Sequence, residues 1–190
     1  MSNVTFDIDI DMPDRSKILD IIEHIPAGII KNDVLTKHNT GVYLHEIPTH
    51  PITGVSTIDY KEAEDRGYFK VDFLNNSVYA DVRDNDHLDE LINTEPMWEL
   101  LEHEEFVKEL PHMANHFDIV KVIKPQSVED LAVVLALIRP GKRHLLEKDR
   151  KEIDNNIWNI NEEDSYTFKK SHAISYAVTI VVKMNLLSGV

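Results

Sequence analysis

The chain has 190 residues, of which 42% are hydrophobic and 28% are charged, and its net charge is −14 at pH 7. This composition supports a buried core and excludes a disordered chain. The absence of cysteine excludes disulfide bonds and thiolate metal sites, and it favours a cytoplasmic location. The excess of acid argues against unaided binding to nucleic acid, because lysine and arginine supply most of the affinity for phosphate.

The two ends of the sequence give no indication of export or membrane insertion. Residues 1–5 contain no basic segment followed by an apolar run, so we expect no secretory signal. The most apolar stretch, residues 173–190, is interrupted by four polar residues, namely Ser175, Thr179, Lys183 and Asn185. This pattern predicts a buried element and not a membrane span, and we expect no membrane partner.

The first part of the chain is rich in strand signals. Residues 6–11 alternate apolar with acidic side chains, and this period of two is typical of a strand. Pro13 is typical of a helix start, so we expect a helix over residues 15–24 that Pro-Ala-Gly at 26–28 closes. The other elements expected here are a strand at 41–44, a loop at 46–54, a short helix at 61–66 stopped by Gly67, and a strand at 68–74.

From Asp86 onward the apolar pattern is helical, with a predicted helix from Pro96 and another over residues 111–121. Ser127 is expected to cap a helix that runs to Ile138, with Asp130 near the capping-box position. Strands therefore precede helices. This order predicts an α+β fold, with a small sheet and flanking helices in residues 1–85 and a helical region in residues 86–190.

Three acids lie on one face of the first predicted strand, namely Asp7, Asp9 and Asp11. Neighbouring carboxylates repel each other, so removing one is expected, if anything, to stabilise the chain. Hard oxygen ligands select Mg²⁺ or Mn²⁺, and two such ions can clamp both oxygens of a phosphoryl transfer. Asp72 is the candidate for a third ligand, and Lys70 would share its face and contact a phosphate. The alternative is the solvated face of an amphipathic strand.

Several segments occur in the order found in the catalytic core of the C-family bacterial DNA polymerases. Together they resemble the palm and fingers of the DNA polymerase III alpha subunit. The palm-like segments are residues 6–15, 37–42 and 59–74. The fingers-like segments are residues 123–131, 136–141 and 168–177.

The resemblance implies a palm-like first domain, a fingers-like second region and a Mg²⁺ or Mn²⁺ cofactor. It assigns catalysis and metal binding to three carboxylates, Asp7, Asp9 and Asp72, with Asp11 as a flanking acid. It assigns substrate binding to Lys70, Arg139, Lys170 and His172. In the family's reaction a primer 3′-hydroxyl attacks the α-phosphate of a nucleotide, and pyrophosphate leaves.

Two departures from the family bear on function. The family's glycine- and serine-rich phosphate loop has no counterpart ahead of Asp7, and Asn75 stands where the family usually has glycine. One hypothesis is a metal-dependent DNA nucleotidyltransferase that acts on primed DNA and deoxynucleotides with replication proteins or a complementary polymerase fragment. The alternative is a catalytically inactive replication-associated binding protein, or an inhibitor of a host polymerase. The shortening of a polymerase-like core suggests that a phage encodes the chain. The expected location is then the cytoplasm of a bacterial host.

Other residues have simpler interpretations. His112 and His116 have the i, i+4 spacing of a helical zinc site, but ordinary surface histidines are the favoured interpretation. Trp98 and Trp158 are expected to be core anchors. The basic residues between Lys142 and Lys151 are the best candidate for a nucleic-acid contact, although a solvated helix explains them equally well.

Overall fold

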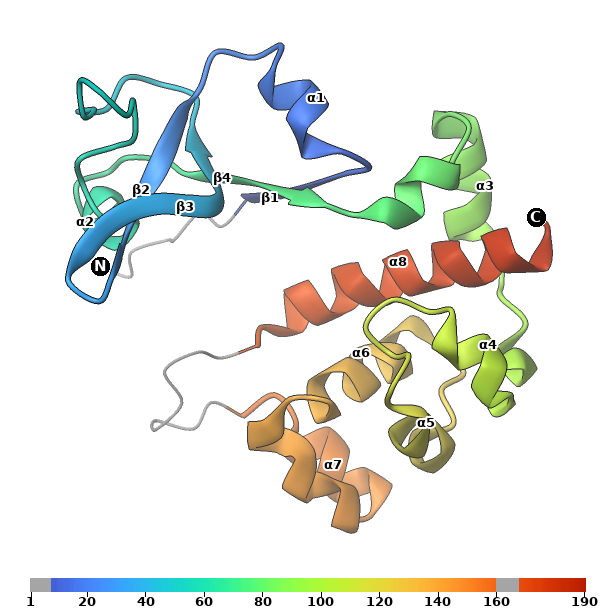
Figure 1. Ribbon diagram of the computed structural model, residues 1–190. Coiled ribbons are helices and arrows are strands. Elements are labelled where there is room, and N and C mark those ends of the chain that lie inside the picture. Colours follow the sequence, from blue (N-terminus) through green and yellow to red (C-terminus); the bar gives the residue numbers. More distant parts are fainter. Residues whose placement is uncertain (1–7, 160–167) are drawn as a thin grey trace. The chain divides into compact units, whose positions relative to one another are not determined.

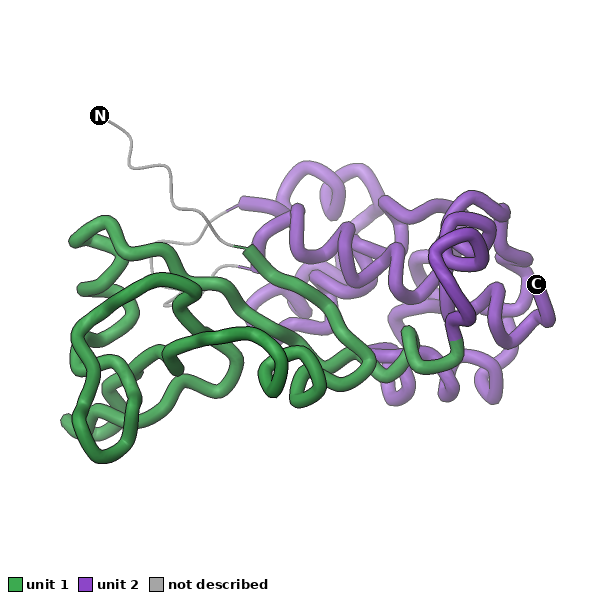
Figure 2. Tube along the Cα trace, turned by 90° about the horizontal axis from the view of Figure 1, so that it is seen from above, with its two compact units in different colours: residues 1–81 green, residues 82–190 purple. Residues whose placement is uncertain are grey.

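A computed structural model of the chain describes residues 8–159 and 168–190. The chain divides into two compact units, Met1–Asp81 and Val82–Val190, which are coloured separately in Figure 2. Within the described ranges, no helix is long and apolar enough to cross a membrane. Each unit has its own core and is described by itself.

The first unit is built on a four-stranded sheet with the strand order β1-β4-β3-β2 (Figure 1). The strands are β1 (Ile8–Met12), β2 (Ile25–Lys31), β3 (Val34–Tyr43) and β4 (Val71–Asn75). β1 and β4 are parallel, whereas β2 and β3 form an antiparallel hairpin, and β3 is antiparallel to β4. The mixed sheet with helices around it confirms the predicted α+β class.

Two short helices cover opposite faces of this sheet. Val42 and Tyr43 follow each other in β3 and therefore point to opposite faces. Val42 packs in a cluster with side chains of α1 (Arg15–Leu19), and Tyr43 packs in one that includes Ala63 of α2 (Tyr60–Asp65). The sheet is thus the middle layer of the unit.

The ends of these helices follow local sequence signals. Asp14 and Asp59 are the N-caps, and their side chains accept the backbone N–H groups of Ser16 and Lys61. Gly67 stops α2 as predicted, since its φ of +86° is in the left-handed region that favours glycine. A 3₁₀ helix, η1 (Ser77–Asp81), ends the unit.

The predicted helix over residues 15–24 is too long, and the strand that follows was not predicted. Helix α1 ends at Leu19, and Pro26, Ala27 and Gly28 lie inside β2 instead of closing a helix. A Cβ on Gly28 would lie 2.7 Å from the carbonyl oxygen of Ser56, so this glycine permits close backbone packing. A glycine that permits close contact between strands therefore looks the same in the sequence as a glycine that stops a helix.

The second unit is helical, and its core surrounds α6 (Val128–Leu137). All residues of α6 from Leu131 to Leu137 are buried, and α6 packs along α8 (Lys170–Ser188), as Figure 1 shows. The other elements are α3 (Asn85–Asn93), η2 (Trp98–Glu102), α4 (Glu104–Lys108), α5 (Phe117–Ile123), η3 (Pro140–Glu147) and α7 (Arg150–Asn156). Trp98 and Trp158 pack against this core, which confirms their predicted role as anchors.

Ser127 is the N-cap of α6, as predicted, and its hydroxyl accepts the backbone N–H of Asp130 at 3.1 Å. Asp130 accepts the backbone N–H of Gln126 at 3.0 Å, one residue ahead of the position that a capping box uses. The helix predicted over residues 111–121 begins only at Phe117. His112 has a φ of +64°, which is incompatible with a helix at that residue.

Candidate functional site

The predicted acid site comprises three carboxylates, Asp7, Asp9 and Asp72. Of these, Asp9 and Asp72 lie on the face of the sheet that α2 covers. Asp9 of β1 and Asp72 of β4 are partners in the parallel register, so their side chains share one face. Asp72 is between Val71 and Phe73, which belong to the cluster on the α1 side, and it therefore points the other way. The third predicted ligand, Asp7, lies outside the described residues.

Asp72 is the buried centre of the site, with an exposed fraction of 7%. One carboxylate oxygen, Oδ1, accepts a hydrogen bond from the hydroxyl of Thr40 at 2.5 Å. The other, Oδ2, forms an ion pair with the ammonium of Lys70. Residues two apart on extended chain share a face, as predicted for Lys70 and Asp72, but the ion pair between them was not predicted. Both oxygens of this carboxylate therefore have a partner.

His38 organises the backbone of β3 beside Asp72. Its Nδ1 accepts the backbone N–H of Gly41 at 2.8 Å and that of Thr40 at 3.3 Å. An atom that accepts these bonds carries no proton, so the 3.7 Å approach of Nδ1 to Asp72 is not an ion pair. Burial lowers the pKa of His38, and the positive charge of Lys70 lowers that pKa further. Both effects keep the imidazole neutral.

Tyr60 and Gly41 complete the walls around Lys70. The Tyr60 ring meets His38 edge-on with centroids 5.2 Å apart, and the Lys70 ammonium lies 5.7 Å from the Tyr60 centroid. A Cβ on Gly41 would lie 2.6 Å from Cδ of Lys70 and 3.0 Å from Nδ1 of His38. The absence of a side chain at Gly41, which is paired in register with Asp72, is what gives Lys70 its place.

Sequence reasoning placed His38, Thr40 and Gly41 in a family-like segment but gave them no part in the site. They belong to β3, which was predicted to begin only at Gly41 and in fact begins at Val34. The period-two pattern of Val34, Thr36, His38 and Thr40 is the signal that could have extended the strand. An extended β3 beside the strand of Asp72 would have brought Thr40 and His38 to that carboxylate.

The far end of the acid strand is tied to its neighbours by asparagines. Asp11 is partly buried, and its carboxylate accepts a hydrogen bond from the side-chain amide of Asn76 at 3.3 Å. Asn75 accepts the backbone N–H of Arg15 with its side-chain oxygen at 2.8 Å. The asparagine at the family's glycine position therefore connects the end of β4 to the start of α1.

The acid site suits a hard divalent cation in the kind of its ligands. Carboxylate and hydroxyl oxygens are what Mg²⁺ and Mn²⁺ prefer, and Asp72 already holds one cation, the ammonium of Lys70. Among the residues whose placement is described, no group of three histidine, aspartate or glutamate side chains could hold a metal ion. Asp9 and Asp72 thus supply two carboxylates, and Asp7 would have to supply a third.

The predicted substrate-binding residues of the second unit lie near the start of α8. Arg139 is exposed, and its guanidinium lies 4.5 Å from the centroid of the Phe168 ring. Lys170 opens α8, with its ammonium 6.0 Å from the Trp158 ring. His172 is partly buried in the first turn of the same helix. Arg139 and Lys170 thus each stand over an aromatic ring, an arrangement that nucleic-acid-binding surfaces also use.

The structure weakens the case for the other candidate sites, the histidine pair and the basic segment. The i, i+4 spacing of His112 and His116 does not place them on one helix face, because α5 begins after both. Most cations of the segment between Lys142 and Lys151 are engaged within the unit. Arg143 pairs with Asp118, Lys148 pairs with Glu152, and Arg150 pairs with Asp130 and Asp154.

Comparison with known proteins adds no relative to this picture. The resemblance to the C-family polymerases therefore stays a prediction from the residues themselves. No protein-family model, no curated protein and no solved structure matches the chain.

Proposed function

We propose that the acid site binds Mg²⁺ or Mn²⁺ and that the chain acts in DNA replication as a DNA polymerase III alpha-like nucleotidyltransferase with partner subunits. The in-register pairing of Asp9 with Asp72 carries the proposal. It places two carboxylates on one face of adjacent strands, next to a lysine that can neutralise phosphate. The order of the palm-like and fingers-like segments supports the same function.

The roles of the residues follow from their chemistry. Asp9, Asp72 and Asp7 would hold the metal, which would stabilise charge on the attacking and leaving oxygens. A cation at Asp72 competes with the Lys70 ammonium for Oδ2. The released lysine would then turn to the phosphates of a bound nucleotide, while Thr40 keeps Oδ1 of Asp72 in place. Arg139, Lys170 and His172 would contact the nucleotide or the template.

The acidity of the chain requires help in binding DNA. A net charge of −14 repels the phosphate backbone, and the acid site adds to this repulsion until cations occupy it. We therefore include in the proposal a basic partner, either a replication protein or a complementary polymerase fragment, that binds the primed DNA.

Metal binding can be tested before activity. Mn²⁺ titrated into the labelled chain should broaden the backbone amide signals of β1 and β4, because the ion is paramagnetic. Asp9→Asn and Asp72→Asn should each abolish the local broadening, whereas Asp65→Asn, at the exposed end of α2, should not. Primer extension with Mg²⁺, nucleotides and candidate replication partners should show the same dependence. The absence of both local broadening and extension would refute the catalytic proposal.

A non-catalytic role is favoured by a different observation. Thr40 and Lys70 satisfy both oxygens of Asp72 without any ion, as in a site whose acid has become structural. On this alternative the chain is a replication-associated binding protein or an inhibitor of a host polymerase. Capture of a replication protein by the chain, unchanged in Asp9→Asn, would support it. Loss of that capture in Asp9→Asn, without unfolding, would point back to the acid site.

A further inference from the structure

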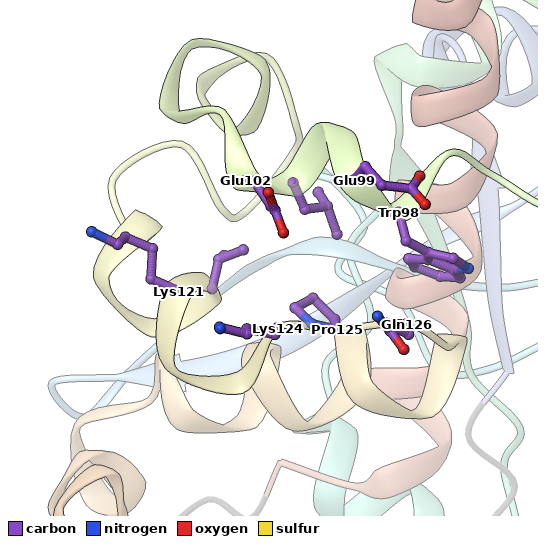
Figure 3. A pocket seen from close by; sticks show the side chains of 9 residues that line it. Trp98, Glu99, Glu102, Lys121, Lys124, Pro125 and Gln126 are labelled. Carbon is purple, nitrogen blue, oxygen red and sulfur yellow. The ribbon is translucent and has the colours of Figure 1, made fainter.

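The second unit contains a pocket that none of the predicted site residues lines. It lies between η2 and the end of α5 and has a volume of about 310 Å³ (Figure 3). Its floor is apolar, with Leu101, Val120 and Pro125 buried and Trp98 half-buried. A volume of this size falls in the range of small-ligand sites.

The walls of this pocket carry charges of opposite sign. Glu99 and Glu102 come from η2, where residues three apart share a face, and Lys121 and Lys124 come from the α5 side (Figure 3). All four side chains are exposed, and none of them takes part in an ion pair within the described parts of the chain. Elsewhere in the unit, by contrast, Lys108, Arg143 and Arg150 are paired with acids.

The pocket is also held in shape. The indole N–H of Trp98 donates to the carboxylate of Glu95 at 2.5 Å, which fixes the orientation of the ring. Lys124 ends α5 with a φ of 50°, in the left-handed region where glycine is the usual residue. A lysine there costs conformational free energy that a glycine would avoid, and its side chain lines the pocket.

We propose that this pocket binds a small zwitterion of the α-amino-acid class with an aromatic or apolar side chain. The carboxylate of the ligand lies toward Lys121 and Lys124, and its ammonium lies toward Glu99 and Glu102. The side chain packs on Trp98 and the apolar floor. The ligand thereby supplies each wall with the counter-ion that the opposite wall does not reach, since no ion pair among the described residues bridges the pocket.

The charge pattern disfavours a polyanion such as a nucleotide. Two glutamates balance the two lysines at the pocket, and the field of a chain with a net charge of −14 adds to the repulsion of phosphate. A zwitterion has no net charge, so this field does not oppose its approach. The proposal concerns the second unit and does not depend on the acid site of the first.

The test uses the full-length chain and the indole N–H signal of Trp98 in a nitrogen–proton correlation spectrum. A Trp158→Phe variant distinguishes the signal of Trp98 from that of the other tryptophan. The probes are L-phenylalanine, 3-phenylpropionate, which lacks the ammonium, phenethylamine, which lacks the carboxylate, and adenosine monophosphate. L-phenylalanine should shift the Trp98 signal saturably, and each one-charge analogue should bind at least roughly ten-fold more weakly.

Two variants assign the charges without risk to the fold. Lys124→Gly removes the ammonium while it relieves the left-handed backbone, so it should weaken L-phenylalanine and leave phenethylamine unchanged. The double change Glu99→Gln and Glu102→Gln should weaken L-phenylalanine and leave 3-phenylpropionate unchanged. The proposal is overturned if L-phenylalanine gives no saturable shift in the millimolar range, if a one-charge analogue binds equally well, or if adenosine monophosphate binds more tightly.

Discussion

The ammonium of Lys70 and the carboxylate of Asp72 form an ion pair across a single intervening residue, and both side chains are at least four-fifths buried. This pairing changes the expectation that removal of a clustered acid stabilises the chain. Neutralising an unpaired acid that lies among other acids relieves the electrostatic repulsion between them. Asp72 has its own cation, so its neutralisation leaves a largely buried ammonium without a full partner.

We therefore predict that Asp72→Asn destabilises the first unit by about 1–3 kcal/mol, and that Lys70→Met in the same background costs much less than it does alone. Both tryptophans belong to the second unit, so tryptophan fluorescence does not report on this change. Hydrogen exchange of the β3 and β4 amides measures it instead. Additive effects of the two substitutions would contradict the ion pair.

Gly41→Ala should disturb the same pair through sterics alone. The new Cβ would lie 2.6 Å from Cδ of Lys70, so the lysine side chain must move away from Asp72. We expect a loss of about 1–3 kcal/mol from overpacking. Gly67→Ala is the matched control, because it strains a backbone with a φ of +86° but meets no neighbouring atom.

The two glycine variants differ in what they do to Lys70. The ammonium signal of Lys70 in a carbon–nitrogen spectrum should change in Gly41→Ala and stay unchanged in Gly67→Ala. Equal spectra for both variants would show that Gly41 has no special role in placing Lys70.

Asn185 should be essential to the stability of the second unit, although it interrupts an apolar helix. Its side chain is 1% exposed, and its amide donates to the carbonyl oxygens of Leu91 and Thr94, each at 2.8 Å. These carbonyls lie at the end of α3, where the carbonyl groups of a helix have no hydrogen-bond donor within the helix. Asn185→Leu should therefore cost about 2–4 kcal/mol, because two carbonyl groups lose their donor.

The Asn185 prediction can be followed by tryptophan fluorescence during urea unfolding. Ser175→Ala in the same helix is the control. Its hydroxyl donates to the carbonyl of Ser171 on an exposed surface, so the change should stay within about 0.5 kcal/mol. An Asn185→Leu variant as stable as Ser175→Ala would show that the hydrogen bonds between α8 and α3 do not stabilise the unit.

The stability of the second unit should fall in acid partly because of Asp130. Burial alone would raise the pKa of this carboxyl, but the backbone N–H of Gln126 and the guanidinium of Arg150 lower that pKa below its ordinary value of 3.8. The unfolded chain therefore takes up the proton first as the pH falls. The stabilisation is fully present above pH 3.8 and is lost as the pH falls through the pKa of the folded state.

Asp130→Asn cannot undergo this loss. The variant should be less stable than the parent chain near neutral pH, and the difference between the two should shrink below about pH 4. Urea midpoints measured at several pH values test this. A difference that stays constant across the series would mean that the charge of Asp130 is not what stabilises α6.

Features that depend on neighbouring residues were predictable from the sequence. The Ser127 cap and the stop at Gly67 follow from the chemistry of one short segment. The alternation of Asp9 and Asp11 with isoleucines follows from the pleat of a single strand. The shared face of Lys70 and Asp72 is of the same kind, since residues two apart on extended chain point to the same side.

Features that depend on partners far along the chain were decided by the tertiary structure. Residues 26–28 carry a helix-stop signal, and pairing with β3, together with close packing against the segment of Ser56, makes them a strand. Thr40 and Gly41 reach Asp72 because β3 lies against β4, a pairing of strands thirty residues apart that no local pattern specifies. The sequence by itself determined that acids line one strand. The sheet decided that Asp72, an acid of another strand, is paired with Asp9 of the acid strand and buried with a lysine. Burial and cross-strand register exist only once distant segments have come together.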